Sequence, residues 1–149
     1  MNFVHGFILA AFLVTSTQST PFKTCSEGAA PSDVRVDGCT KNPCTLYRGT
    51  NATAEWDFIV NEDTKVLKPR VRATVMGATV NYPFPQKNAC ISLKNAKCPL
   101  DAGENVTYQL SMPVLKAYPK IPLTIEFAFL DDKDSVVVCF KLAARVADK

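Results

Sequence analysis

Cysteine carries the clearest chemistry in this chain, at Cys25, Cys39, Cys44, Cys90, Cys98 and Cys139. An even number of cysteines in an exported chain is typical of disulfide bonding. Proximity favours the pairs Cys39–Cys44 and Cys90–Cys98, which leaves Cys25–Cys139 by exclusion, but the sequence alone keeps other pairings open. If all six are paired, no thiol remains for catalysis or for binding a metal.

The N-terminal segment indicates export. Residues 3–14 are mostly apolar, form a run too short to span a bilayer, and are followed by small polar residues. Thr17 and Ser19 fit the small-residue rule for cleavage, so we predict a signal peptide over residues 1–19 and one mature domain over residues 20–149. A buried N-terminal helix is the alternative. We expect secretion or residence in the lumen of endosomes or lysosomes.

An absence argues against catalysis. The only histidine, His5, lies in the segment predicted to be removed. The mature chain would then lack the histidine that Ser-His-Asp and Cys-His nucleophiles, general bases and many zinc sites use. The sequence has no glycine-rich phosphate loop, and no carboxylate pair stands out for glycoside hydrolysis. We therefore predict a binding protein with no enzymatic activity, metal or cofactor.

The charge of the chain is weakly basic, with a formal net charge of +3. That value is too small to indicate nucleic-acid binding, and no basic helix or base-stacking motif supports such binding. One local stripe does stand out, because Lys68, Arg70 and Arg72 share a strand face and Lys65 precedes them. A solvated outer face is the favoured interpretation, and a dock for anionic lipid headgroups is the alternative.

Alternation of apolar and polar residues predicts half-buried antiparallel strands. The pattern recurs in five segments, at residues 53–60, 70–75, 105–112, 121–129 and 136–146. Most prolines fall between these segments, and no stretch of ten or more residues keeps a helical period. The sequence therefore predicts an all-β domain built as a two-sheet sandwich. Cys139 shares the polar face of its strand, so it either points outward to Cys25 or lies near a bulge.

Two kinds of short motif lie at the ends of these segments. Residues 131–134 read Asp-Asp-Lys-Asp, which we interpret as a polar hairpin turn because no EF-hand pattern surrounds it. Asn51 and Asn105 begin Asn-x-Thr acceptors, and we predict N-glycosylation at both in an exported chain.

Two proline-rich segments, at residues 76–85 and 112–122, place aromatic residues directly before prolines. A proline disfavours helix at the residue before it. The segments are therefore either stiffened loops that plug the ends of a sandwich core or the rim of an apolar opening between two sheets.

The order of several short motifs resembles the ML (lipid-recognition) domain family over essentially the whole mature chain. The motifs are Phe22-Lys-Thr-Cys25, Cys39-x4-Cys44, Met76-Gly77, Tyr82-Pro-Phe-Pro85, Cys90, Cys98-Pro99, Leu110-x-Met-Pro-Val114, Tyr118-Pro-x-Ile121 and Leu130-Asp-Asp-Lys133 to Cys139. The resemblance implies an immunoglobulin-like sandwich with an apolar pocket between its sheets and three disulfides.

The resemblance also implies which residues bind the ligand. In the sterol carriers of this family the pocket is entered beside positions that match Tyr82, Val114 and Tyr118. Two aromatic positions in their final strands match Phe127 and Phe140. The candidate set is completed by Phe84, within the Tyr-Pro-Phe-Pro motif, and by Trp56, on the apolar face of residues 53–60.

The implied function is binding and transfer of a lipid. The loop that ends at Tyr82 departs from the sterol carriers, since a tyrosine replaces a phenylalanine and Asn81 adds polarity. The expected ligand is therefore a sterol, a fatty acid or another apolar lipid. We expect a monomer that makes transient contact with anionic membranes or with a membrane sterol transporter. The alternative function is an innate-immune or chemosensory protein that recognises a lipid, a lipopolysaccharide or a small volatile.

Overall fold

The computed structural model describes residues 10–13 and 18–149. His5, Thr17 and most of the predicted signal peptide lie outside these residues. The described residues contain the strands β1 Lys23–Thr24, β2 Asp33–Val36, β3 Cys44–Tyr47, β4 Asn51–Ile59, β5 Lys68–Val75, β6 Ala78–Tyr82, β7 Asn105–Pro113, β8 Pro122–Leu130 and β9 Val136–Ala147, and the short 3-10 helix η1 Ala89–Ser92. Within the described part of the chain, no helix is long and apolar enough to cross a membrane.

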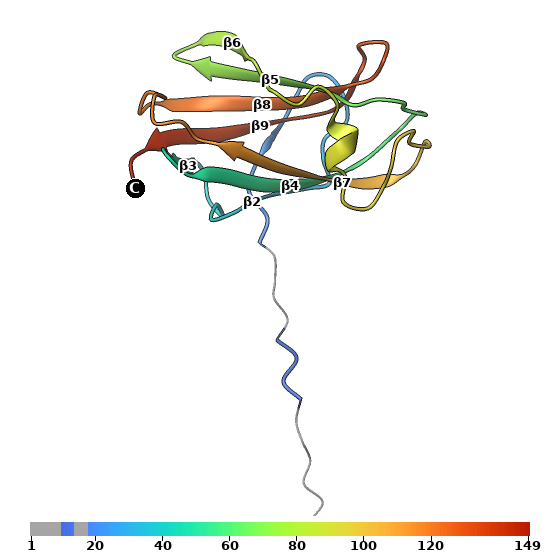
Figure 1. Cartoon of the computed structure of the whole chain (residues 1–149), viewed down its shortest axis with the longest axis horizontal. Helices are drawn as coiled ribbons and strands as arrows, with labels where there is room; N and C mark the ends of the chain where they lie inside the picture. Colours follow the sequence, from blue (N-terminus) through green and yellow to red (C-terminus); the bar gives the residue numbers. More distant parts are fainter. Residues whose placement is uncertain (1–9, 14–17) are drawn as a thin grey trace, which may run out of the picture.

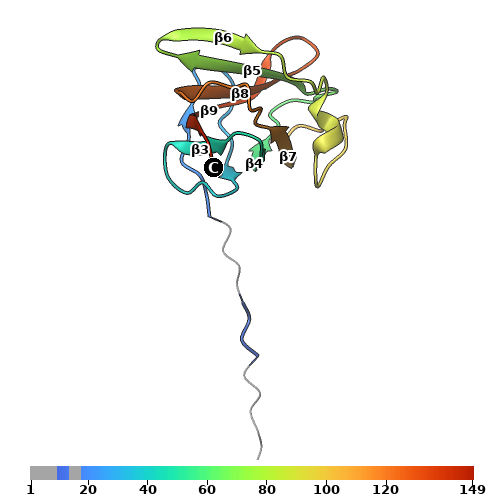
Figure 2. The same cartoon turned by 60° about the vertical axis from the view of Figure 1, so that its left-hand side comes forward.

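The strands form two sheets that lie one on the other (Figure 1). The larger sheet has the order β1-β9-β8-β5-β6, and β3 pairs with β9 in parallel. The smaller sheet has the antiparallel order β2-β4-β7. The helix η1 lies beside β7 in both views (Figures 1 and 2). The predicted all-β, two-sheet sandwich is confirmed.

Five strands follow the alternating segments closely, namely β4, β5, β7, β8 and β9. The alternation aims one set of side chains into the space between the sheets, because successive residues of a strand point to opposite faces. In β4, for example, Ala54, Trp56 and Phe58 are buried while Thr53 and Glu55 are only half-buried. The structure adds β6 inside the segment 76–85, where a tight turn at Met76 and Gly77, both with positive φ, joins it to β5.

Aromatic rings fill the centre of the sandwich. Trp56 lies 5.4 Å from Phe127 and 5.0 Å from Phe140 between ring centroids, and Phe127 stacks on Phe140 at 5.6 Å. Tyr108 and Phe129 pack against the same indole. Because Trp56 comes from the smaller sheet and Phe127 and Phe140 from the larger one, the aromatic cluster joins the two layers.

Three disulfides brace the fold: Cys25–Cys139, Cys39–Cys44 and Cys90–Cys98. The two short pairs are those that proximity favours, Cys25–Cys139 is the pair left by exclusion, and no described cysteine is left free. Cys139 lies on the outer face of the larger sheet and is nevertheless buried, because the segment around Cys25 and Ala29 covers it. The Cys139 amide donates to the Ala29 carbonyl at 3.0 Å. Cys139 therefore points outward to Cys25, and the β8–β9 pairing also has an irregularity nearby, between Val136 and Val138, so both features that the sequence offered as alternatives are present.

The segment 131–134 forms the turn between β8 and β9. The Asp131 carboxylate accepts hydrogen bonds from the amides of Lys133 and Ser135, each at 2.9 Å. The Asp131 carbonyl accepts from the Asp134 amide, and Asp134 has a positive φ. The prediction of a hairpin turn is confirmed.

Candidate functional site

An apolar pocket of about 270 Å³ opens at one end of the sandwich. Its walls come from both sheets and from the loop between β7 and β8. The lining residues are Leu46, Val71, Ala73, Val80, Tyr82, Met112, Val114, Tyr118, Pro119, Ile121, Leu123, Ile125 and Val146. Its volume lies just below the range of about 300–1,000 Å³ that is typical of small-molecule sites.

The strand pattern explains why this pocket is apolar. Val71 and Ala73 on β5 lie directly opposite Phe127 and Ile125 on β8, and all four side chains point between the sheets. The intervening residues of both strands are polar and point out of the sandwich. The same alternation that builds the core therefore lines the pocket wherever the two sheets diverge.

Two tyrosines supply the polar groups at the pocket. The hydroxyls of Tyr82 and Tyr118 lie 2.6 Å apart and share a hydrogen bond, and their rings meet edge to face. They are the only lining residues with a polar side chain among the described residues around this pocket. The pKa of Tyr118 is raised to about 12, mainly by burial and to a smaller extent by the hydrogen bond with Tyr82. The Tyr118 phenol is therefore neutral at physiological pH and can donate or accept a hydrogen bond.

Val114 is held in place by its backbone. Its amide donates to the Thr50 carbonyl at 2.8 Å, and its carbonyl accepts from the Gly49 amide at 2.6 Å. Only 3% of the residue is exposed, yet its side chain lies against the pocket. The structure therefore brings together three of the sequence-predicted ligand residues, Tyr82, Val114 and Tyr118.

The other four predicted ligand residues do not line this pocket. Trp56, Phe127 and Phe140 belong to the central aromatic cluster, and Phe84 is half-buried against the core. Phe127 is nevertheless the direct neighbour of the lining residue Val71 across the β5–β8 pair. The aromatic cluster therefore adjoins the pocket, and a ligand that enters more deeply would meet these rings.

Sequence reasoning missed part of the lining. The alternating pattern placed Met112, Leu123 and Val146 on apolar faces, but it gave no reason to separate pocket residues from core residues. Leu46 lies on β3, a four-residue strand that pairs in parallel with β9 and has no sequence pattern of its own. These side chains are distinguished from those of the filled core only by their place in the folded structure.

Carboxylates neutralise two of the four residues of the basic stripe defined above, Lys68 and Arg72. Lys68 forms an ion pair with Asp134, and Arg72 Nε lies 2.5 Å from Glu126 Oε2. These pairs favour the interpretation of this stripe as a solvated face. Glu126 also lies within 4.8 Å of the sulfurs of Cys25 and Cys139. Those sulfurs are joined in a disulfide, so they are not thiolates that could bind a metal.

The two glycosylation acceptors lie at opposite ends of one strand pair. Asn51 is the first residue of β4 and Asn105 the first of β7, and both are exposed. Exposure at strand ends leaves room for a glycan at either position. Their use remains a prediction.

Comparisons with known proteins agree with this architecture. A family model described as ML domain matches residues 19–146. The chain is 28% identical over 145 residues to "NPC intracellular cholesterol transporter 2 homolog a" of Drosophila melanogaster, which covers 95% of this chain and 97% of that protein. Among solved structures, a Niemann-Pick type C2 protein from the Japanese carpenter ant matches with a TM-score of 0.77 and 23% identity, over 85% of this chain and 99% of that one.

A second solved structure, chicken MD-1 in complex with lipid IVa, has a TM-score of 0.53 and 16% identity over 82% of this chain and 85% of that one. At these identities the two solved structures support the fold alone. The family model, which matches residues 19–146, shows the family as well. The chain belongs to the ML-domain family of lipid-recognition proteins, which bind their ligands and are not enzymes.

Proposed function

We propose that this protein binds one apolar lipid with a single small polar end, with a sterol as the leading example, and transfers it between membranes. The observation that carries the proposal is the composition of the pocket. Eleven of its thirteen lining side chains are aliphatic, methionine or proline, and the two phenol hydroxyls lie together. If a ligand had several polar groups, most of those groups would be buried without hydrogen-bond partners, and this would lower the free energy of binding that the ligand gains.

Burial of apolar surface is the proposed source of affinity. A ligand that buries about 400 Å² gains about 10 kcal/mol at about 25 cal/mol per Å², before the costs of association and ordering are subtracted. The phenol pair then orients the ligand, because one hydroxyl or carboxyl group can replace the hydrogen bond that the two tyrosines make with each other.

Entry of a larger lipid requires the mouth to widen. Tyr82 belongs to the six-stranded sheet, while Tyr118 lies in the loop that follows β7 of the other sheet. Their hydrogen bond is thus a link across the mouth, and breaking it costs only about 1 kcal/mol. Small parting of the sheets at this end is the proposed route for loading and release.

The small volume argues against a ligand with several acyl chains. Chicken MD-1 was solved with lipid IVa, but a pocket of about 270 Å³ is near the lower limit for one compact ligand. A carrier of a single lipid is therefore favoured over recognition of a lipopolysaccharide. The three disulfides suit an oxidising compartment, which supports a place in the secretory pathway or an endolysosomal lumen.

Two measurements test this proposal. A fluorescent sterol should saturate the purified protein at one ligand per chain, and mass spectrometry of the lipid extracted from protein secreted by its own cells should identify a sterol or a similar single-headed lipid. If folded protein takes up neither a sterol nor a fatty acid, the carrier function is refuted. An acylated saccharide in the extract would instead favour recognition of a lipopolysaccharide.

A further inference from the structure

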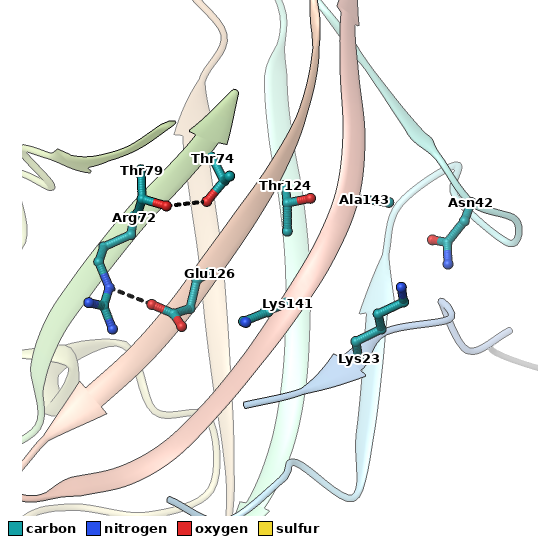
Figure 3. Close-up of a pocket in the computed structure, with 9 residues that line it drawn as sticks. All are labelled: Lys23, Asn42, Arg72, Thr74, Thr79, Thr124, Glu126, Lys141 and Ala143. Carbon is teal, nitrogen blue, oxygen red and sulfur yellow. Dashed lines mark hydrogen bonds and ion pairs between the residues drawn. The ribbon is translucent and has the colours of Figure 1, made fainter. Parts of the chain in front are cut away.

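A second, larger groove of about 470 Å³ lies on the outer face of the six-stranded sheet (Figure 3). It is separated from the apolar pocket by the sheet itself, because alternate residues of β5 and β8 point to opposite sides. On β5, Val71 and Ala73 line the pocket. The alternate residues of the same strand, Arg72 and Thr74, line the groove. The two hollows are therefore distinct sites.

One row of charged side chains crosses the strands along this groove. Arg72 on β5 is opposite Glu126 on β8, Glu126 is opposite Lys141 on β9, and Lys141 is opposite Lys23 on β1. Figure 3 shows Arg72 and Lys23 at the two ends, with Glu126 and Lys141 between them. Neighbouring strands are about 4.8 Å apart, so the row spans a length that suits an extended ligand.

The charges in this row are unbalanced. Glu126 is bonded to Arg72, and neither Lys23 nor Lys141 has an ion-pair partner within 4.0 Å among the described residues. Like charges directly opposite on neighbouring strands repel each other. On the outer face of the smaller sheet, by contrast, Arg35 is paired with carboxylates on three residues. Figure 3 shows the two amines pointing apart, that of Lys141 toward Glu126 and that of Lys23 toward Asn42, so each is available to a separate anionic group of one ligand.

Beside the charged row runs a row of small side chains. Thr79 is opposite Thr74, Thr74 is opposite Thr124, and Thr124 is opposite Ala143. The hydroxyls of Thr74 and Thr79 share a hydrogen bond of 2.8 Å. These short residues leave the depth of the groove open, and the Asn42 amide adds a further hydrogen-bonding group at its edge.

We propose that this groove binds an acidic oligosaccharide, with sulfate or carboxylate groups on the lysines and sugar hydroxyls on the threonines and the asparagine. The groove has no aromatic or large aliphatic side chain among its lining residues, so it lacks the apolar anchor on which protein partners depend. Its central strands β5, β8 and β9 are paired on both sides, and only its two ends reach the outer strands β6 and β1, so a peptide strand could not pair along the length of the groove. Lys23 is exposed and Lys141 half-buried, so both amines can be reached by the charged groups of a slender chain that lies along the groove.

The test uses a heparin-derived tetrasaccharide as the anionic probe and an uncharged maltotetraose as its control, by calorimetry at low ionic strength. The sulfated probe should bind and the neutral one should not, and added salt should weaken the binding. Lys23→Ala with Lys141→Ala should lower the affinity about tenfold, the effect of losing two exposed ion pairs near the upper end of their usual strength. Glu126→Gln should raise the affinity about threefold by removing the opposing charge.

A matched control separates the groove from general basicity. Lys65→Ala with Lys97→Ala removes the same charge from two exposed lysines outside the groove and should leave the affinity unchanged. Equal losses in the two double variants would overturn the proposal, because they would show non-specific attraction. So would tighter binding of polyglutamate or of vesicles with anionic lipids, since these would indicate a protein partner or a membrane. Binding of a fluorescent sterol should stay constant in all three variants, which keeps this test independent of the lipid pocket.

Discussion

The substitution Val114→Phe tests whether the apolar pocket is space reserved for a ligand. The backbone of Val114 is fixed by hydrogen bonds to Thr50 and Gly49, so a larger side chain has to extend forward into the pocket. In a filled core, added bulk of this kind costs about 1–3 kcal/mol. In an open pocket of about 270 Å³ the ring has room, and the change in the free energy of unfolding should be less than about 1 kcal/mol.

The effect of the same substitution on binding should be large. A benzyl group has four carbons more than an isopropyl group, and these carbons take the place of ligand. At about 0.8 kcal/mol per buried methylene, the lost burial is about 3 kcal/mol, which corresponds to about a hundredfold loss of affinity. Urea denaturation and titration with a fluorescent sterol measure the two quantities on the same protein.

Val138→Phe is the matched control, because Val138 is equally buried but belongs to the filled core and does not line the pocket. We expect Val138→Phe to lose about 1–3 kcal/mol of stability. If Val114→Phe is destabilised as much as Val138→Phe and still binds the sterol normally, the pocket has been placed in the wrong part of the fold.

Three further predictions follow from single contacts. In Tyr82→Phe and Tyr118→Phe, affinity for a sterol should fall about two- to tenfold while affinity for its methyl ether changes less, since each variant removes one hydroxyl partner; equal losses for both ligands would contradict the orienting role. Burial raises the pKa of Tyr108 from 10 to about 12, so the folded state holds this proton more tightly, and stability on the order of 2–3 kcal/mol at most should be lost as the pH rises from 10 through 12. Denaturation at pH 9 and pH 11.5 should show a smaller loss in Tyr108→Phe, and an identical loss would refute this assignment. Finally, Thr20 is buried; its amide donates to the Val34 carbonyl at 2.7 Å and its hydroxyl to the Cys39 carbonyl at 2.6 Å. The mature protein should therefore keep Thr20, and intact-mass analysis should find cleavage after Ser19 or earlier; a mature chain that lacks Thr20 would contradict this prediction.

The sequence predicted the sheets better than it predicted the pocket. Residues 53–60 and 140–146 alternate so regularly that one face is predicted to be buried, and the structure follows that pattern in β4 and in the later part of β9; in the earlier part of β9, Cys139 is buried on the outer face as well. Short elements carry no such signal. β3 has four residues and is held by parallel pairing with β9, and β6 follows a turn at Met76 and Gly77 inside a segment rich in prolines.

The candidate site shows the same limit. The matching motifs led to Tyr82, Val114 and Tyr118, which the structure brings together at one opening. Phe127 and Ile125 are apolar residues on the same face of the same strand, yet only Ile125 lines the pocket. Phe127 packs on Trp56 and Phe140 in the aromatic cluster, whereas Ile125 lies beyond these rings, and the alternating pattern does not distinguish the two positions.

The positions of the pocket and the groove on opposite faces of β5 and β8 limit which sequence changes these strands can accept during evolution. Over residues 71–74 of β5 and 123–126 of β8, apolar residues that line the pocket alternate with polar residues that line the outer groove. Substitutions can therefore alter one side without touching the other, so the two surfaces are free to diverge at different rates. An insertion or deletion of one residue has the opposite effect, because it would turn every later side chain of the strand to the wrong face. Among relatives of this chain, we expect β5 and β8 to vary freely in residue type and hardly at all in length.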